Sequence, residues 1–379
     1  MSAPVYLDYN ATAPIRPEAA QAALDAMRIG GNPSSVHAAG RAARAVVESA
    51  REAVAALAGA RPADVVFTSG GSEANTLAIA SAVRRGGAGR LIVGATEHAS
   101  VLEAAKASGL PVELWPVTGD GVAGLDWLAV RLKAWSSADG RPFVALMAAN
   151  NETGVIQPLP EAAALVHEAE GWLHVDAVQA AGRIAIDIAA DTLSLSAHKL
   201  GGPQGSGALV VGCDIEIART AFGGGQERGR RGGTENLPGI AGFGAAAAAA
   251  ALESGPDQAA WRDAAAARLK READVTVLGE GAPRLPGTLC FASPGWSSEM
   301  QVMALDLAGL MVSSGSACSS GKVRPSHVVA AMGRADLAGS VLRVSGGWSS
   351  TRHDWDLFAD AWLDAWARRS ARVRPLVEA

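Results

Sequence analysis

The chain has 379 residues, of which 49% are hydrophobic and 19% are charged, and its formal net charge is −5 at pH 7. The composition is typical of a globular protein, and the length exceeds what one hydrophobic core usually supports, so we expect a large and a smaller domain. The acidic balance gives no electrostatic basis for binding nucleic acid or an anionic membrane surface, and neither is expected as a partner.

No apolar run reaches the roughly 18 residues of a membrane span, and the start, MSAPVYLDYN, lacks the basic and apolar regions of a signal peptide. The three cysteines, Cys213, Cys290 and Cys318, are too few and too scattered for a disulfide framework or a four-ligand zinc site. We therefore expect a cytoplasmic protein without a metal site.

Short β-branched runs alternate with helical patterns between about residues 60 and 212, which is the signature of a mostly parallel sheet covered by helices. Strands are predicted at 64–68, 90–94, 112–116, 142–148, 172–176, 192–196 and 208–212. Helices are predicted at 38–58, 73–85, 100–108 and 160–170 and in the alanine-rich run 239–252.

A boundary is expected at 254–257, after which two strands at 274–278 and 288–292 and a helix at 298–307 indicate a smaller α+β domain. The prediction is therefore an α/β fold with two domains. Residues 13–253 are assigned to the large domain, and residues 1–12 and 254–379 to the small domain.

The segment SAHKLGGPQGSG (196–207) follows a predicted strand. A lysine at a strand end, beside a glycine-rich loop that lets a ligand approach the backbone, could form a Schiff base with an aldehyde cofactor. Taken by itself, Lys199 fits an exposed loop lysine better, because lysines are common and reactive ones are rare.

Asp176 ends another predicted strand, where it could keep a pyridine nitrogen protonated, although an isolated Asp here would fit a helix N-cap better. The run TSGGSEAN (68–75) passes from a strand through a glycine turn into a helix. Free N–H groups and the positive helix end suit a phosphate there, but the lysine of a nucleotide-binding Walker loop is missing.

His98 and Asn151 follow two further predicted strands. A lone His is usually structural, and an Asn-rich turn is usually only a turn. In open α/β sheets, however, polar groups at the ends of successive strands converge on one crevice. The strand ends together therefore predict a single ligand site.

These segments together resemble the cysteine desulfurases, members of the class V group of pyridoxal-phosphate (PLP) enzymes. The resemblance covers nearly the whole chain and includes LDYNAT (7–12), GNPSSVH (31–37), GGGQE (223–227), RGGTEN (231–236), SSGSAC (313–318) and LRVS (342–345). Two departures are DYNATA (8–13), where most members have NNATT, and Ser72, which often is Thr but keeps the hydroxyl. The implied fold has a large PLP-binding domain and a smaller domain that carries the active-site cysteine loop.

The resemblance also implies roles for individual residues. Lys199 binds PLP covalently, and Lys199, His98 and Cys318 are catalytic. Arg343 holds the substrate carboxylate, with Asn151 and Asn10 beside it. Thr234 reaches the phosphate of a second subunit, which implies a homodimer. The other residues expected to bind the cofactor are Asp176 at the pyridine nitrogen, Gln179 and Asn151 near the phenolic oxygen, His98 on the ring, and Gly71, Ser72, Ser196 and His198 at the phosphate.

Cys318 decides which reaction is expected. It lies among small polar residues, as an exposed thiol would, whereas Cys213 and Cys290 are flanked by apolar strand residues and are interpreted as packing. By resemblance, L-cysteine becomes L-alanine and the sulfur forms a persulfide on Cys318, destined for an iron–sulfur scaffold or a tRNA thiolation carrier. The segment 313–324 resembles the family's long loop, which favours direct delivery to a partner protein.

Two other classes remain open. An aminotransferase or selenocysteine lyase of the same fold would not need Cys318 with cysteine as substrate. A non-catalytic scaffold or regulator would bind the cofactor poorly or turn nothing over.

Overall fold

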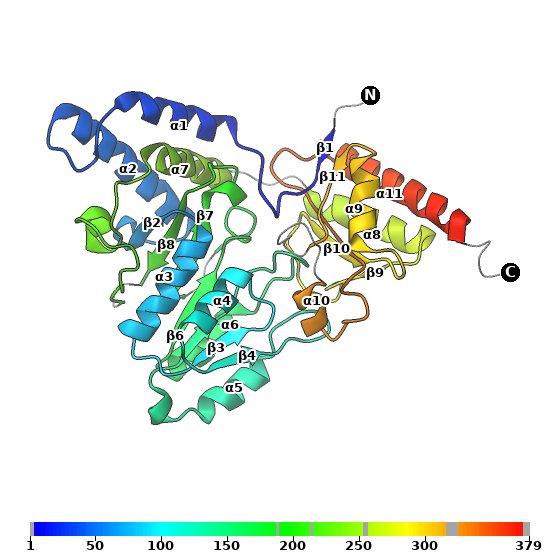
Figure 1. The fold of residues 1–379 in the computed structure, drawn as a ribbon, viewed down its shortest axis with the longest axis horizontal. Helices are drawn as coiled ribbons and strands as arrows, with labels where there is room; N and C mark the ends of the chain where they lie inside the picture. Colours follow the sequence, from blue (N-terminus) through cyan, green and yellow to red (C-terminus); the bar gives the residue numbers. More distant parts are fainter. Residues whose placement is uncertain (1–3, 187–188, 213–214, 253–256, 316–324, 374–379) are drawn as a thin grey trace.

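The computed structural model describes residues 4–186, 189–212, 215–252, 257–315 and 325–373. A large body and a smaller one lie side by side in Figure 1, with a long C-terminal helix on the outer side of the smaller body. None of the helices in these ranges is both long and apolar enough to cross a membrane.

A seven-stranded sheet forms the centre of the large body, as the sequence predicts. Its order is β2 (Val65–Thr68), β8 (Gly207–Val211), β7 (Thr192–Ser196), β6 (Trp172–Asp176), β5 (Phe143–Ala145), β3 (Leu91–Gly94) and β4 (Val112–Trp115). The strands from β7 to β4 pair in parallel, and β8 runs antiparallel to both of its neighbours. The predicted α/β fold with a mostly parallel sheet is confirmed.

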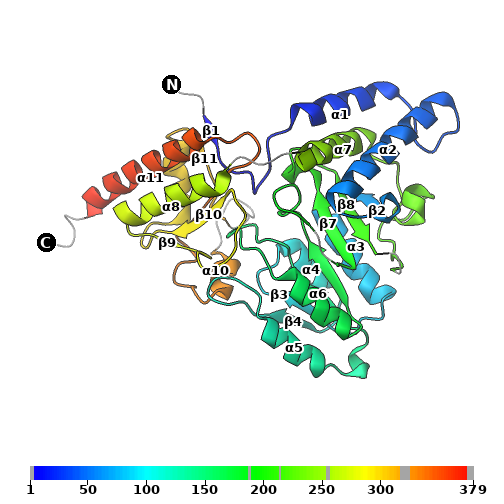
Figure 2. The ribbon, with the colours of Figure 1, turned by 180° about the vertical axis from the view of Figure 1, so that it is seen from behind.

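Helices cover both faces of this sheet, and the alternation of side chains along each strand decides which helix meets which residue. On β5, Val144 packs in a cluster with α2, α6 and α7, while Phe143 and Ala145 pack with α3 and α4. Figure 1 shows α3 and α4 on the near face, and Figure 2 shows α6 and α7 from the other side. The helices of this body are α1 (Pro17–Ile29), α2 (Ala38–Leu57), α3 (Gly71–Arg84), α4 (Ala99–Ala107), α5 (Leu125–Lys133), α6 (Leu159–Glu168) and α7 (Leu237–Leu252).

The alanine-rich helix α7 packs closely against its neighbours, because small side chains let helix backbones approach. A Cβ atom added at Gly244 would lie only 2.6 Å from the backbone of Ala50 on α2. Short 3-10 helices join several elements of the large body. They are η1 (Pro62–Asp64), η2 (Ser137–Asp139), η3 (Ala197–Lys199) and η4 (Gln226–Gly229).

The smaller body is built on an antiparallel sheet in the order β12 (Val341–Ser345), β10 (Thr288–Ala292) and β9 (Thr276–Val277). A second pair, β1 (Val5–Tyr6) and β11 (Leu310–Met311), is parallel and brings the N-terminus into this body. Aromatic side chains fill its core, where the rings of Phe291 and Trp362 meet edge to face. Its helices are α8 (Gln258–Glu272), α9 (Ser298–Asp306), α10 (His327–Ala331) and α11 (Arg352–Val373). The predicted domain boundary stays a prediction, since residues 253–256 lie outside the described ranges.

A buried ion pair fixes the segment that precedes Thr234. Arg51 on α2 makes two hydrogen bonds to the Glu227 carboxylate, at 2.8 and 3.0 Å, and both residues are at most 4% exposed. The same carboxylate accepts the N–H of Phe67, and Glu227 has a left-handed backbone with φ 48°. This pair therefore holds an unfavourable turn against the sheet.

We predict that Glu227→Gln lowers the free energy of unfolding by about 3 kcal/mol or more, because it removes the buried carboxylate from both Nη groups of Arg51 and leaves only the partly exposed Glu48 at Nε. Urea denaturation measures the change. The control is Glu48→Gln, which removes the partly exposed carboxylate 3.1 Å from the same guanidinium and should cost less than about 1 kcal/mol. Equal effects of the two substitutions would contradict the prediction.

Candidate active site

A cavity of about 480 Å³ lies at the end of the large sheet, where the two bodies meet. Its lining includes most residues that the sequence singles out: Asn10, Gly71, Ser72, His98, Asn151, Asp176, Gln179, Ser196, His198, Lys199 and Arg343. Thr234 is exposed and does not line it, and Cys318 lies outside the described residues. The predicted convergence of strand ends is therefore present.

Parallel strands explain this convergence, because their carboxyl ends open at one edge of the sheet. Asp176 is the last residue of β6 and Ser196 the last of β7, and η3 then carries Lys199. Arg343 comes from β12 of the smaller body, so the site has walls from both bodies.

Lys199 extends toward the N-terminal segment, where its Nζ donates hydrogen bonds to the carbonyl oxygens of Asn10 at 2.5 Å and Ala11 at 2.8 Å. Burial, and after it the positive charges of Arg343 and Arg183, together lower its pKa from 10.5 to about 7, against the opposing effect of Asp8 and Asp176. A large share of the amine is thus free near neutral pH, as a nucleophile or a base requires.

Asp176 ends a chain of hydrogen bonds through the interior. Its Oδ2 accepts from Asn75 Nδ2 at 2.8 Å, Asn75 Oδ1 accepts from His174 Nε2 at 3.0 Å, and His174 Nδ1 accepts from the Thr192 hydroxyl at 2.9 Å. Burial lowers the pKa of His174 to about 4, so its ring is neutral and can take this tautomer. Asp176 Oδ1 accepts the backbone N–H of Val178. Because both partners of Asp176 are neutral, its charge can still pair with a cationic nitrogen.

The start of α3 forms another part of the cavity wall. Gly71 is the first residue of this 14-residue helix, and no side chain caps it. A Cβ atom at Gly71 would lie 2.7 Å from the Val178 side chain, so the backbone passes closer to the segment after β6 than another residue would allow. Free N–H groups, the helix dipole and the Ser72 hydroxyl make this end suitable for a phosphate.

His98 is the N-cap of α4, and its Nδ1 accepts the backbone N–H of Ser100 at 3.1 Å. Its ring is exposed to the cavity. Burial of the ring by the walls lowers the pKa of His98, and the charge of Lys199 adds to this against the effect of Asp176. A neutral ring with its proton on Nε2 is the form that these contacts favour.

The cavity walls also contain polar atoms with no partner, which tests whether PLP fits. Gln179 Oε1 and Arg343 Nε are both buried and make no hydrogen bond. A buried polar atom without a partner costs free energy, which a bound ligand would recover. An acidic group for a pyridine nitrogen, a lysine amine and a phosphate cradle share the cavity with these atoms, so the residues present fit PLP.

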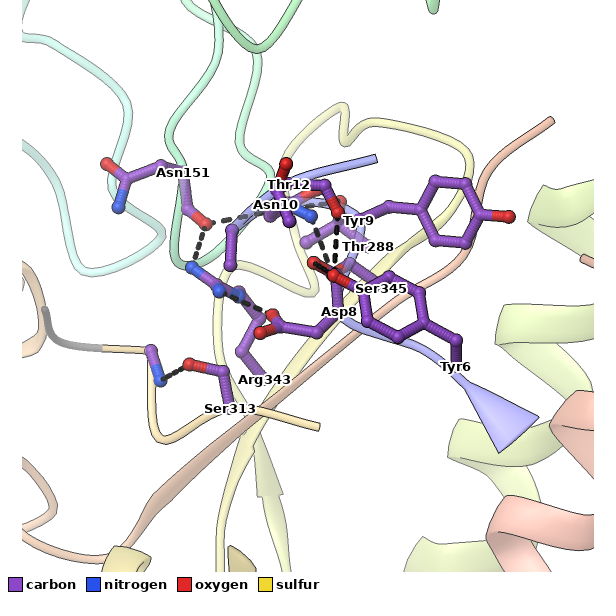
Figure 3. Close-up of polar contacts among 12 residues, drawn as sticks. Tyr6, Asp8, Tyr9, Asn10, Thr12, Asn151, Thr288, Ser313, Arg343 and Ser345 are labelled. Carbon is purple, nitrogen blue, oxygen red and sulfur yellow. Dashed lines mark hydrogen bonds and ion pairs between the residues drawn. The ribbon is translucent and has the colours of Figure 1, made fainter. Parts of the chain in front are cut away.

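Arg343 extends from β12 of the smaller body, and Figure 3 shows its guanidinium between Asn151 and Asp8. Its Nη1 donates to the carbonyl oxygen of Asn151 at 3.0 Å, and its Nη2 lies 2.8 Å from Asp8 Oδ1. Asn10 Nδ2 donates to the same Asn151 oxygen at 3.1 Å. Sequence reasoning missed Asp8 and Asn75 as members of the site, although both stand inside segments that it had marked.

Of the three cysteines, only Cys290 lies within the described residues. Cys290 is wholly buried on β10, and burial raises the pKa of its thiol, as packing rather than reactivity requires. Cys213 and Cys318 lie outside the described residues.

We predict that the Lys199 amine of the cofactor-free protein titrates near pH 7, protonated below and free above. The measurement is carbon NMR of the dimethylated lysines, with the exposed Lys106 as the reference signal. Arg343→Gln should raise the midpoint of Lys199, because it removes a positive charge that disfavours the protonated amine. A midpoint that stays near 10, or that does not respond to Arg343→Gln, would contradict the prediction.

Comparison with known proteins bears on the whole chain. The pattern of the family described as Aminotransferase class-V matches residues 5–358. A cysteine desulfurase of Cereibacter sphaeroides is 43% identical over 342 residues, which cover 86% of each chain. A putative cysteine desulfurase named IscS 1 from Bacillus subtilis is 38% identical, over 92% of this chain and 94% of its own.

A solved structure is similar over nearly the whole chain. The X-ray structure of a NifS-like protein from Rickettsia africae superimposes with a TM-score of 0.88 at 30% sequence identity. The match covers 96% of this chain and 99% of the other. The similarity therefore includes both bodies and the cavity between them.

Proposed function

Because this chain belongs to the aminotransferase class-V family as a cysteine desulfurase, we propose that it works with PLP on Lys199 and takes the sulfur of L-cysteine onto Cys318. The observation that carries the proposal is that Lys199, Asp176 and Arg343 line the same cavity. One cavity thus offers a depressed-pKa amine, a carboxylate with neutral partners and a buried guanidinium.

The residues that would hold PLP all line the cavity. Asp176 would pair with the pyridine nitrogen, Gln179 and Asn151 would serve the phenolic oxygen, and His98 would cover the ring. Gly71, Ser72, Ser196 and His198 would bind the phosphate. When bound, PLP would supply an electron sink for the pair that develops on the substrate Cα.

Residues of this chain then position the substrate and move protons. Arg343 binds the substrate carboxylate with its planar guanidinium, with Asn10 and Asn151 beside it. The free amine of Lys199 removes the Cα proton, for which a pKa near 7 is well matched at neutral pH. His98, on the edge of the same cavity, assists the later return of a proton to the three-carbon product.

Sulfur transfer is the step that needs Cys318. Its thiolate attacks the substrate Sγ, so an S–S bond forms as the Cβ–Sγ bond breaks, and the departing carbon skeleton keeps the electron pair. Protonation of that skeleton gives L-alanine, and the enzyme holds a persulfide. One cysteine and one thiol thus yield one alanine and one persulfide, without an external oxidant.

We predict that the PLP-loaded wild type forms alanine from L-cysteine and, with a reducing thiol present, an equal amount of sulfide. Cys318→Ala should form neither, while its yellow cofactor absorbance stays unchanged. Alanine and sulfide are quantified in parallel. Full activity of Cys318→Ala would remove Cys318 as the acceptor and favour a lyase or aminotransferase, and an inactive wild type that binds cofactor poorly would favour a scaffold.

The second part of the proposal is a homodimer with shared sites. Thr234 is exposed and outside the cavity of its own chain, on a segment that the Arg51–Glu227 pair holds in place. This placement leaves the Thr234 hydroxyl free to reach the phosphate of a second copy.

Mixed dimers test this arrangement. We predict that a dimer of one Lys199→Ala chain and one Thr234→Ala chain regains about half of the wild-type rate, because one of its two sites then has both groups. The alanine-forming rate of the purified mixed dimer is compared with both parent variants. A mixed dimer no faster than Thr234→Ala would place Thr234 in the site of its own chain.

The persulfide sulfur is destined for another protein, either an iron–sulfur scaffold or a carrier for tRNA thiolation. The resemblance of segment 313–324 to the family's long loop supports direct delivery. A cytoplasmic location fits, because a reducing compartment keeps Cys318 as a thiol.

A further inference from the structure

An ion pair inside the cavity is not used by the proposed reaction. Asp8 Oδ1 and Arg343 Nη2 are 2.8 Å apart, with side chains that are 20% and 5% exposed. Both residues line the cavity, and Figure 3 shows the guanidinium between Asp8 and Asn151. The group assigned to the substrate carboxylate therefore already faces a carboxylate of the protein.

The backbone fixes Asp8 in this position. Asp8 forms a parallel bridge to Ser345, two residues after Arg343 on β12. The Tyr6 hydroxyl spans the following turn, donating to the carbonyl oxygens of Thr12 at 2.8 Å and Asp8 at 3.3 Å. Asp8 is thus a built part of the site rather than a side chain that happens to reach it.

The guanidinium still has donors to offer. Of its five N–H groups, one on Nη2 binds Asp8, one on Nη1 binds the Asn151 carbonyl and the one on Nε is buried, which leaves one N–H on each Nη for a ligand. Arg343 can therefore bind a ligand carboxylate while it keeps Asp8. Within the described residues, Asp8 Oδ2 accepts no hydrogen bond, so Asp8 also has an acceptor to offer.

We propose that Asp8 and Arg343 together select zwitterionic amino acids, with Arg343 binding the α-carboxylate and Asp8 receiving the α-ammonium group on arrival. A simple carboxylate would place a second negative charge beside Asp8 on one guanidinium. An α-amino acid brings its own positive charge to face Asp8. The proposal rests on the proposed function, since it assigns the substrate side of that same site.

The test uses two probes of the same shape that differ in charge. N,N-dimethylglycine is a zwitterion, and its tertiary amine cannot condense with an aldehyde. 3-Methylbutanoate has a carbon in place of the nitrogen and is only an anion. Calorimetry on the PLP-loaded enzyme gives both dissociation constants for wild type and for Asp8→Asn, which keeps a hydrogen-bonding oxygen but removes the charge.

We expect the wild type to discriminate in favour of the zwitterion, and Asp8→Asn to shift the ratio of the two dissociation constants by about tenfold toward the anion. A shift of this size is what the loss of one like charge at close range in a partly buried site provides. An equal change for both probes would mean that Asp8 only positions Arg343, and no change would mean that Asp8 does not face the ligand. Either result overturns the proposal.

Two controls keep the outcome decisive. Asp64→Asn removes a carboxylate 2.7 Å from Arg61 at the far side of the large body and should leave the ratio unchanged. If Asp8→Asn does not fold, Asp8→Ser removes the same charge and is measured with the same probes. Neither probe is converted by the enzyme, so the binding selectivity is measured independently of alanine formation. A failure of the selectivity proposal can therefore be distinguished from a failure of the proposed function.

Discussion

The site depends on one short piece of chain, the turn after β1, which connects the two bodies through Asn10. The backbone carbonyl oxygen of Asn10 accepts hydrogen bonds from Lys199 and Gln179 of the large body. Its backbone N–H donates to Ser345, and its side-chain amide donates to Thr288, both in the smaller body. Asn10 is 1% exposed, so these bonds form away from water, where an unpaired group would be expensive. The width of the cavity is therefore set by a residue that bonds to both of its walls.

Burial also sets the charges around that turn. After burial itself, the charges of Arg343 and Arg183 lower the pKa of Lys199, and the charge of Arg343 lowers the pKa of Arg183. Lysine is the group that can lose its proton, because the guanidinium charge is retained even where burial lowers the pKa of Arg183 to about 10. The reactive amine is thus mainly a consequence of burying a lysine in this cavity, and two nearby arginines add to the effect. Asp8 and Asp176 limit the effect without cancelling it.

Most of the large sheet could be predicted from sequence because its strands are short β-branched runs between turn signals. The strands 172–176 and 192–196 have the predicted bounds, and the position of the site follows, since polar residues at those strand ends must share one edge. Helices α8 and α11 were not predicted. Both are rich in alanine or charged residues and show little apolar periodicity, and what holds α11 in place is the aromatic core of the smaller body.

The missed site residues have a different cause. Asn75 on α3 matters because its side-chain amide bonds both His174 and Asp176 of β6. Asp8 matters because β12, more than 300 residues away in the chain, passes beside it. Local patterns carry no information about such pairs. The roles given to Lys199, Asp176 and Arg343 came from resemblance, whereas the reason these residues are suited to those roles is seen only in their partners.

The partners of Asp176 and Arg343 differ in charge, and this difference fits the different roles proposed for the two residues. Asp176 is hydrogen-bonded only by neutral groups, so its charge is held in place without an ion-pair partner, which suits the proposed pairing with a pyridine nitrogen. Arg343, the proposed partner of the substrate carboxylate, is bonded by the charged Asp8, so its charge is already compensated within the protein. A residue that binds a permanent cofactor, as proposed for Asp176, benefits from an uncompensated charge, because the cofactor then offsets the cost of burying that charge for as long as it stays bound. A group that binds and releases a ligand in every cycle benefits from a partner that limits its affinity, because tight uniform binding would slow release without speeding the chemistry.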